Sequence, residues 1–217
     1  MIAGLAAAFS VAMFGPTTAT EADPVKIVAF GDSLTAGYGL SQEAAFPTRL
    51  EAALRAKGHQ VEIINAGVSG DTASGGRARL AWALPDDADA VIVELGATDA
   101  LRGIDPAATE AALDALLADI RARGLPVLLA GMLAPPNMGA DYEVQFNGIF
   151  PRLAEKHGAL FYPFFLDGVA ADAQFNQGDG IHPNAAGVSI IVERMLPLVE
   201  KLIAAAEPTG TDGMSGG

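Results

Sequence analysis

Five short apolar runs alternate along the chain with segments of helical periodicity. The runs, read as strands, are residues 25–30, 61–65, 90–95, 127–131 and 159–162. The intervening segments, read as helices, are residues 46–57, 73–84 (a broken helix), 106–123, 141–157 and a last helix that Pro183 opens and that runs to about Ala206. This alternation predicts one α/β domain in which a parallel sheet carries helices on both faces. In such a sheet the loops that follow the strands share one edge, where ligands bind near the topological switch point.

The two ends of the chain differ in composition from this middle part. Residues 2–14 are apolar and rich in Ala, as in the hydrophobic region of a signal peptide, and Thr20 and Ala22 suit a signal peptidase. We therefore expect a signal peptide over 1–22, a domain over 23–206, and a disordered Gly-, Thr- and Ser-rich tail over 207–217. No Lys or Arg precedes the apolar run, so either the α-amino group supplies its only positive charge or the start codon is assigned too late. The alternative interpretation of this run is a short buried helix. A signal peptide would place the mature chain in the periplasm or outside the cell.

Charge and composition exclude several classes of function. The net charge of −13 repels phosphate backbones and anionic membrane surfaces, so we expect no nucleic-acid partner. After signal removal no stretch is long enough for stable membrane insertion. The absence of Cys excludes disulfides, thiolate zinc sites and a Cys nucleophile. The histidines, His59, His157 and His182, lack metal-ligand spacing, so the sequence does not favour a metal site.

A candidate nucleophile and a candidate base lie at opposite ends of this domain. Ser33 follows the first apolar run in a turn, and a Ser hydroxyl becomes a useful nucleophile when a base takes its proton. His182 stands three residues after Asp179, whose carboxylate can hold the imidazole tautomer. Gly67 follows the second run and lets the backbone approach a ligand closely. Taken singly, each of these residues is more typical of an ordinary turn or loop.

Together these segments resemble the SGNH (or GDSL) hydrolase family, in its bacterial periplasmic thioesterase, lysophospholipase and arylesterase branch. The matching segments occur in the family's order and near its spacing over about residues 25–206. They are Gly31-Asp32-Ser33-Leu34-Thr35-Ala36-Gly37-Tyr38, Asn65-Ala66-Gly67-Val68-Ser69-Gly70-Asp71-Thr72, Glu94-Leu95-Gly96, Asp99-Ala100-Leu101-Arg102-Gly103 and Asp179-Gly180-Ile181-His182-Pro183-Asn184.

The resemblance implies a fold, an activity and a set of roles. The fold is a flavodoxin-like three-layer α/β/α sandwich with a five-stranded parallel sheet. The activity is hydrolysis of small-molecule acyl or aryl esters and acyl thioesters through an acyl-enzyme intermediate, without a cofactor. Ser33, Asp179 and His182 would form the catalytic triad, and the backbone N–H groups of Ser33 and Gly67 would form part of the oxyanion hole.

The chain departs from the family at one position. The third segment normally reads Gly-x-Asn-Asp and its Asn amide is an oxyanion donor, whereas this chain places Thr98 there. A Thr hydroxyl can also donate, but it lies nearer the backbone and rotates to other acceptors. Two alternatives therefore stay open: a carbohydrate acetylesterase, and a catalytically weakened ligand-binding homologue.

Four charged residues at this edge of the sheet are expected to brace its loops: Asp32, Asp71, Asp99 and Arg102.

Overall fold

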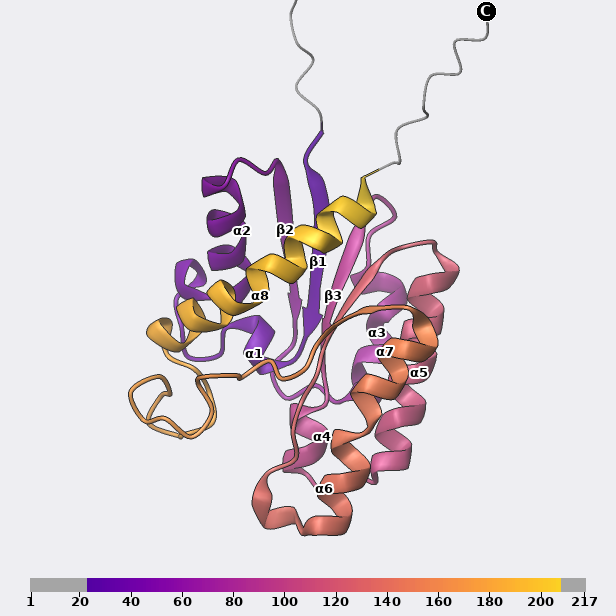
Figure 1. Ribbon diagram of the computed structural model, residues 1–217, viewed down its shortest axis with the longest axis vertical. Helices are drawn as coiled ribbons and strands as arrows, with labels where there is room; N and C mark the ends of the chain where they lie inside the picture. The colour runs from indigo at the N-terminus through magenta and orange to yellow at the C-terminus, as the bar shows by residue number, and fades with distance from the viewer. Residues whose placement is uncertain (1–22, 208–217) are drawn as a thin grey trace, which may run out of the picture.

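The structure, a computed structural model, describes residues 23–207 and is built around one parallel sheet (Figure 1). Its strands are β1 (Val25–Gly31), β2 (Val61–Gly67), β3 (Ala90–Glu94), β4 (Val127–Ala130) and β5 (Leu160–Tyr162). The strand order β2-β1-β3-β4-β5 confirms the predicted flavodoxin-like sheet. In this order the chain reverses direction across the sheet between β1 and β3, which makes the ends of these strands the switch point.

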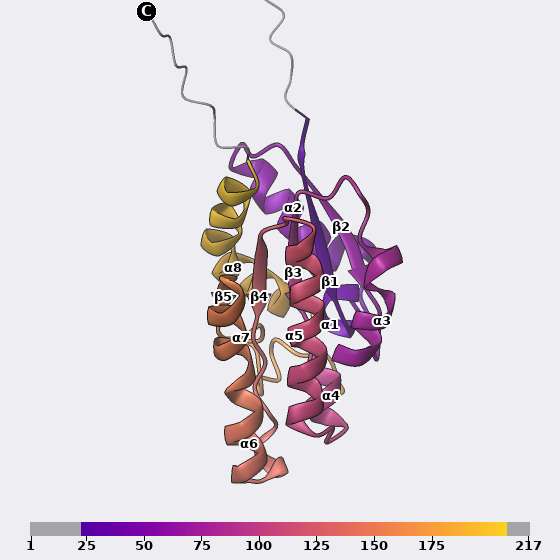
Figure 2. The ribbon, with the colours of Figure 1, turned by 90° about the vertical axis from the view of Figure 1, so that its right-hand side faces the viewer.

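Helices cover both faces of the sheet, which confirms the three-layer prediction (Figures 1 and 2). The α-helices are α1 (Ser33–Ala36), α2 (Phe46–Ala56), α3 (Ala73–Ala83), α4 (Ala97–Leu101), α5 (Pro106–Ala122), α6 (Ala140–Asn147), α7 (Ile149–His157) and α8 (Ala185–Ala206). Two short 3₁₀ helices are η1 (Gln42–Ala44) and η2 (Pro136–Met138). Helices α2 and α8 pack together on one face, while α3, α5 and α7 line the other.

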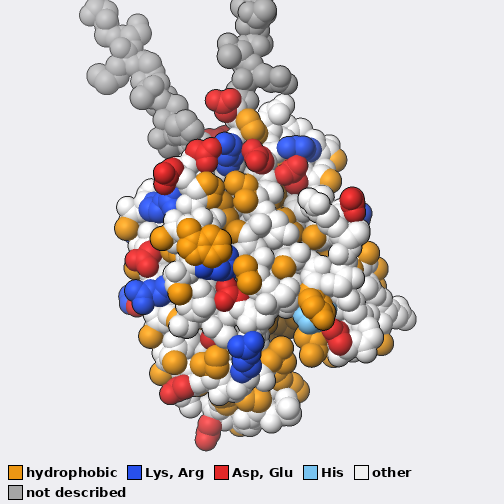
Figure 3. Space-filling model, turned by 180° about the vertical axis from the view of Figure 1, so that it is seen from behind, with side chains coloured by type: hydrophobic (Ala, Val, Ile, Leu, Met, Phe, Trp, Pro, Cys, Tyr) orange, Lys and Arg blue, Asp and Glu red, His pale blue; other side chains and the backbone are white. Residues whose placement is uncertain are grey.

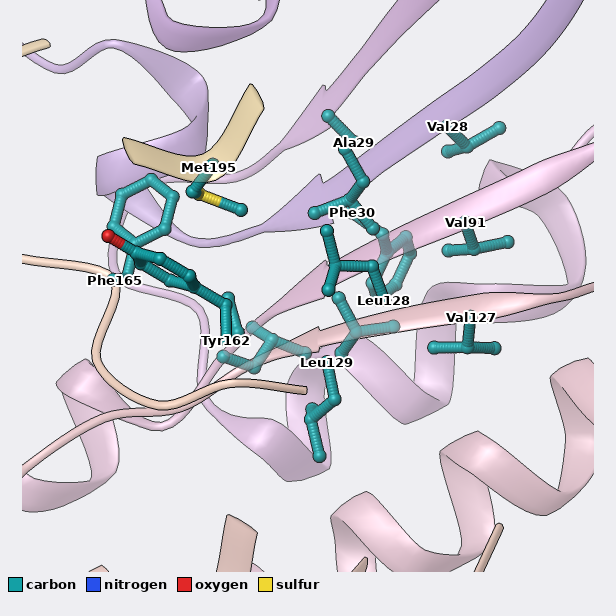
Figure 4. Packing of buried hydrophobic residues seen from close by; sticks show 14 of the residues in the cluster. Val28, Ala29, Phe30, Val91, Val127, Leu128, Leu129, Tyr162, Phe165 and Met195 are labelled. Atoms are coloured by element: carbon teal, nitrogen blue, oxygen red, sulfur yellow. The ribbon is translucent and has the colours of Figure 1, made fainter. Parts of the chain in front are cut away.

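The core follows from the register of the strands. Val28 pairs with Val91, and Val91 pairs with Val127, so three β-branched side chains stand in a row across β1, β3 and β4 (Figure 4). Every residue of β3 and β4 is buried, as expected for strands covered on both faces. The central strands therefore form a rigid base whose carboxyl ends support the loops.

Two predicted helices differ from those in the structure. The segment expected to be a broken helix is the continuous α3, in which Gly76 packs against the residue that follows β3: a Cβ there would lie 2.5 Å from Leu95 Cδ1. This close packing explains a glycine that helical propensity alone disfavours. The segment expected as one helix over 141–157 is divided into α6 and α7. Pro151 lacks the N–H that would bond the carbonyl of Asn147, so the helical ladder is interrupted there.

The last helix begins two residues later than predicted. The Asn184 side chain caps α8, its Oδ1 accepting hydrogen bonds from the backbone N–H groups of Ala186 and Gly187, both at 3.0 Å. Pro183 therefore precedes the cap instead of opening the helix. The predicted signal peptide (1–22) and nearly all of the predicted tail (208–217) lie outside the described residues. Within residues 23–207 no helix is both long enough and apolar enough to cross a bilayer.

The row of valines gives a test of the core. Replacing Val91 by Ala should lower the free energy of unfolding by about 2–3 kcal/mol, because two buried methyl groups are lost and a cavity remains. The matched variant Val144→Ala, at a side chain that is 75% exposed on α6, should change it by less than about 0.5 kcal/mol. Urea unfolding of both variants measures the difference, and equal effects would contradict this packing.

Candidate active site

The candidate nucleophile lies directly at the switch point. β1 ends at Gly31, and after Asp32 the chain enters the four-residue helix α1, whose first residue is Ser33. The Asp32 side chain caps this helix by accepting a hydrogen bond from the N–H of Leu34 at 3.0 Å. As the first helical residue, Ser33 has no intrahelical acceptor for its own N–H. That donor is therefore free to point toward a ligand.

The structure brings together the three predicted triad residues, although Ser33 and His182 lie 149 positions apart in the sequence. Ser33 Oγ lies 2.9 Å from His182 Nε2, and His182 Nδ1 lies 2.7 Å from Asp179 Oδ2. The other Asp179 oxygen accepts hydrogen bonds from the backbone N–H groups of Ile181 and His182. The bond from His182 and these two backbone bonds lower the pKa of Asp179 to about 2. Asp179 is thus an anion at neutral pH, as a group that orients an imidazole must be.

Asp32 braces the nucleophile turn, as predicted. Its side chain is buried, with one oxygen bonded to the N–H of Leu34 and the other accepting the Thr98 hydroxyl at 3.3 Å. Burial raises the pKa of Asp32 to about 6, although the hydrogen bonds from Leu34 and Thr98 oppose this rise. Both carboxylate oxygens are therefore used inside the fold, and Asp32 has a structural role beneath Ser33.

A second buried acid, which the sequence did not single out, lies under the same turn. Glu94 ends β3 opposite Gly31, and its Oε2 accepts hydrogen bonds from the Thr35 hydroxyl at 2.7 Å and the Asp32 N–H at 3.4 Å. Its Oε1 is buried without a partner among the described residues. Burial, and then the charge of Asp32, raise the pKa of Glu94 well above its ordinary value. Glu94 therefore keeps its proton at pH values at which an exposed glutamate is already ionised. In the sequence, the one signal of this residue is that an acid stands inside an apolar run.

Gly31 makes room for this arrangement. A Cβ on Gly31 would lie 2.1 Å from Thr35 Oγ1 and 2.6 Å from Glu94 Oε2. No side chain other than hydrogen fits there without displacing the hydroxyl and the acid that support the turn.

The predicted oxyanion donors have different surroundings. The Gly67 N–H donates to Asn65 Oδ1 at 3.0 Å, and a Cβ on Gly67 would lie 2.3 Å from the backbone nitrogen of Ala36. Gly67 is thus required for close approach to α1 itself. Thr98 is buried beside the same site, but its hydroxyl donates to Asp32 Oδ2. Of the three predicted donors, the Gly67 N–H and the Thr98 hydroxyl already have acceptors inside the protein, and the Ser33 N–H is the one best placed to bind an oxyanion.

The other charged residues at this edge act as braces. Arg79 bonds the Asp71 carboxylate at 2.6 Å and the Gly31 carbonyl at 2.9 Å. Asp99 accepts hydrogen bonds from the N–H of Ala73 and from Thr109, and Arg102 bonds the carbonyl of Gly70. These contacts tie the loops after β1, β2 and β3 together.

A cavity of about 410 Å³ opens beside Ser33. Its lining is mostly apolar and includes Leu34, Ala97, Leu101, Met132, Leu133, Pro135, Phe164, Leu166 and Ile181. On the face seen in Figure 3, hydrophobic side chains surround a hollow beside a histidine. Such a cavity suits the apolar part of a small molecule.

Comparison with known proteins agrees with this geometry. The profile of the GDSL-like lipase/acylhydrolase family matches residues 29–190. Thioesterase 1/protease 1/lysophospholipase L1 of Escherichia coli K12 is 38% identical over 186 residues, which cover 85% of this chain and 87% of that protein. An arylesterase of Vibrio mimicus is 36% identical over 185 residues, covering 85% and 92%. The crystal structure of AlinE4, an SGNH-hydrolase family esterase, has 46% identity and a TM-score of 0.72, covering 84% of this chain and 98% of that one.

The buried acid gives a prediction for stability against pH. Above about pH 4.5 an unfolded chain releases the Glu94 proton while the folded chain keeps it, so the free energy of unfolding falls as pH rises. Each unit by which the pKa of Glu94 is raised corresponds to about 1.4 kcal/mol. Glu94→Gln should remove this loss. Asp32, with a pKa of about 6, and Asp99, whose pKa burial also raises, add losses of their own, so the variant should keep a pH slope that is smaller than that of the wild type.

Urea unfolding at pH 5, 6, 7 and 8 measures the effect. The exposed residue Glu155 gives the matched control, because Glu155→Gln makes the same substitution at a glutamate on the surface of α7. Parallel pH slopes for Glu94→Gln and Glu155→Gln would contradict a neutral Glu94.

Proposed function

Because the chain belongs to the GDSL-like (SGNH) lipase/acylhydrolase family and is a carboxylic ester hydrolase, we propose that Ser33 is its nucleophile. His182 is the general base and Asp179 orients it. The observation that carries this proposal is the continuous hydrogen-bond chain from Asp179 through His182 to Ser33, at 2.7 and 2.9 Å. The substrates are small acyl or aryl esters and acyl thioesters, and the reaction needs no cofactor.

The reaction takes two steps. Ser33 Oγ attacks the carbonyl carbon while its proton moves to His182 Nε2. The tetrahedral intermediate then expels the alcohol or thiol, which takes that proton, and leaves an acyl ester on Ser33. In the second step His182 removes a proton from water, the resulting hydroxide attacks the acyl carbon, and Ser33 Oγ leaves with the proton. Asp179 stays ionised throughout and stabilises the imidazolium.

The oxyanion is held by backbone donors in this proposal. The Ser33 N–H at the start of α1 is the principal donor, and the Gly67 N–H is the second once it turns from Asn65 Oδ1. The Thr98 hydroxyl can contribute only by leaving Asp32. One missing oxyanion donor lowers kcat by about 10²–10³-fold. Thr98 in place of Asn therefore lowers the rate of the reaction but does not change which reaction is catalysed.

The cavity beside Ser33 receives the acyl or aryl part of the substrate. Its lining is mostly apolar, and each buried methylene contributes about 0.8 kcal/mol to binding. This favours an apolar acyl group over the acetylated sugar of a carbohydrate acetylesterase. The complete Ser33–His182–Asp179 chain favours an enzyme over a ligand-binding homologue that has lost catalysis.

The place of action is also a proposal. We infer export to the periplasm or beyond from the apolar, Ala-rich residues 2–14 and the small residues Thr20 and Ala22. The net charge of −13 favours a partner that is a small molecule over a nucleic acid or an anionic membrane.

Replacing Ser33 by Ala tests the nucleophile. Hydrolysis of p-nitrophenyl esters should fall by at least about 10⁴-fold, because no hydroxyl remains to form the acyl-enzyme. Ser74→Ala, at an exposed position on α3, is the matched control and should keep wild-type kinetics. A fluorophosphonate should add its mass to the wild type at Ser33 and leave Ser33→Ala unmodified. Full activity in Ser33→Ala would refute the assignment.

Replacing Thr98 by Asn tests the oxyanion hole. We expect kcat to rise by about 10-fold or more. The Thr98 hydroxyl donates to Asp32, whereas the longer Asn side chain carries an amide donor that reaches farther from the backbone. KM should change little, since the donor acts on the charge of the transition state. A kcat that is flat or lower would mean that the Thr98 hydroxyl, or a water in its place, already serves as donor.

A further inference from the structure

The residue Gln177 connects the two loops on which the nucleophile and the base depend. One loop, residues 37–40, follows α1, and the other, residues 176–184, carries His182 and leads into α8. The first loop is joined directly to the helix that begins with Ser33. The second loop contains no strand or helix of its own. The distance between Ser33 Oγ and His182 Nε2 therefore depends on contacts between these loops.

The Gln177 side chain provides such a contact. Its Nε2 donates to the Tyr38 carbonyl at 2.7 Å in the first loop and to the Pro183 carbonyl at 3.0 Å in the second. Its backbone N–H donates to the carbonyl of His182 itself at 2.7 Å. Both protons of one amide are thus used to join two residues that are far apart in the sequence.

The first loop is shaped to receive this amide. Gly39 has φ of +72°, and a Cβ there would lie 2.2 Å from Gln177 Oε1. The chain therefore passes over the amide with no side chain between them. The same turn places the Tyr38 ring against the His182 ring, with centroids 4.5 Å apart and planes tilted by 36°.

We propose that Gln177 is a positioning residue that holds the His182 imidazole against Ser33, acting through its amide bridge and through the Tyr38 ring that the bridge keeps in place. This inference rests on the proposed function, since it concerns the same triad. Gln177 does not touch the reacting atoms. Its effect comes from geometry, because a misplacement of about 1 Å can cost about 10²-fold in rate.

Kinetics of Gln177→Ala on p-nitrophenyl esters test the proposal. We expect kcat to fall by about 10–100-fold with KM nearly unchanged, because the apolar cavity does not include Gln177. Gln174→Ala is the matched control: the same residue type in a nearby part of the chain, exposed and outside the bridge. Gln177→Glu keeps the shape but turns a carboxylate oxygen toward two carbonyls, and should lose at least as much kcat as Gln177→Ala.

The Tyr38 ring gives a second test that does not risk the fold, because its side chain is 53% exposed. Tyr38→Phe keeps the ring and should retain most of the kcat that Tyr38→Leu loses. Equal kcat in these two variants would overturn the role of the ring.

Ser33→Ala separates this proposal from the proposed function. If Ser33→Ala is inactive while Gln177→Ala has the same kcat as Gln174→Ala, the positioning role is wrong and the triad stands. If Ser33→Ala stays active, the triad itself is wrong. A third result would show that Gln177 contributes to stability alone. In that case Gln177→Ala lowers both kcat and the midpoint of thermal unfolding, while Tyr38→Phe and Tyr38→Leu have the same kcat.

Discussion

The parallel pairing of β1 with β3, in the register that places Gly31 opposite Glu94, is the constraint on which the site depends. Parallel strands end at the same edge, so this pairing brings the turn after β1 and the turn after β3 into contact. Asp32 and Thr98 meet across this boundary, and the nucleophile is carried on top of it. The base lies on a separate loop late in the domain, and this loop packs against a platform that the first half of the chain forms.

Three carboxyl groups near Ser33 differ in pKa because their surroundings differ. Asp179 has three hydrogen bonds and its pKa is lowered to about 2. Asp32 is buried, and burial raises its pKa to about 6 against the hydrogen bonds from Leu34 and Thr98. Glu94, buried next to Asp32, has a pKa raised well above its ordinary value. The anion is thus placed where it can stabilise an imidazolium, and the neutral acid is placed where a charge would oppose Asp32 beneath the nucleophile.

Much of this architecture is readable in the sequence. Apolar runs bounded by turns identified all five strands, and the pairing of Asp179 with His182 could be anticipated from a three-residue spacing. Contacts made across the fold could not be anticipated. The division into α6 and α7 depends on one missing N–H, and the amide bridge of Gln177 depends on a loop with no periodicity. The hydrogen-bond partner of the Thr98 hydroxyl depends on its rotamer and on which side chains lie nearby, and neither can be deduced from the residue type.

The close approach of Gly67 to the backbone of Ala36 has a consequence for engineering this site. There main chain packs directly against main chain, so a new side chain at position 67 has nowhere to go. The cavity beside Ser33 has a different kind of wall, formed by the loop after β4 and by the segment before α8, with side chains such as Leu133 and Ile181 that are nearly half exposed. Libraries intended to change the acyl group that the cavity accepts should vary that wall and leave the glycine side intact.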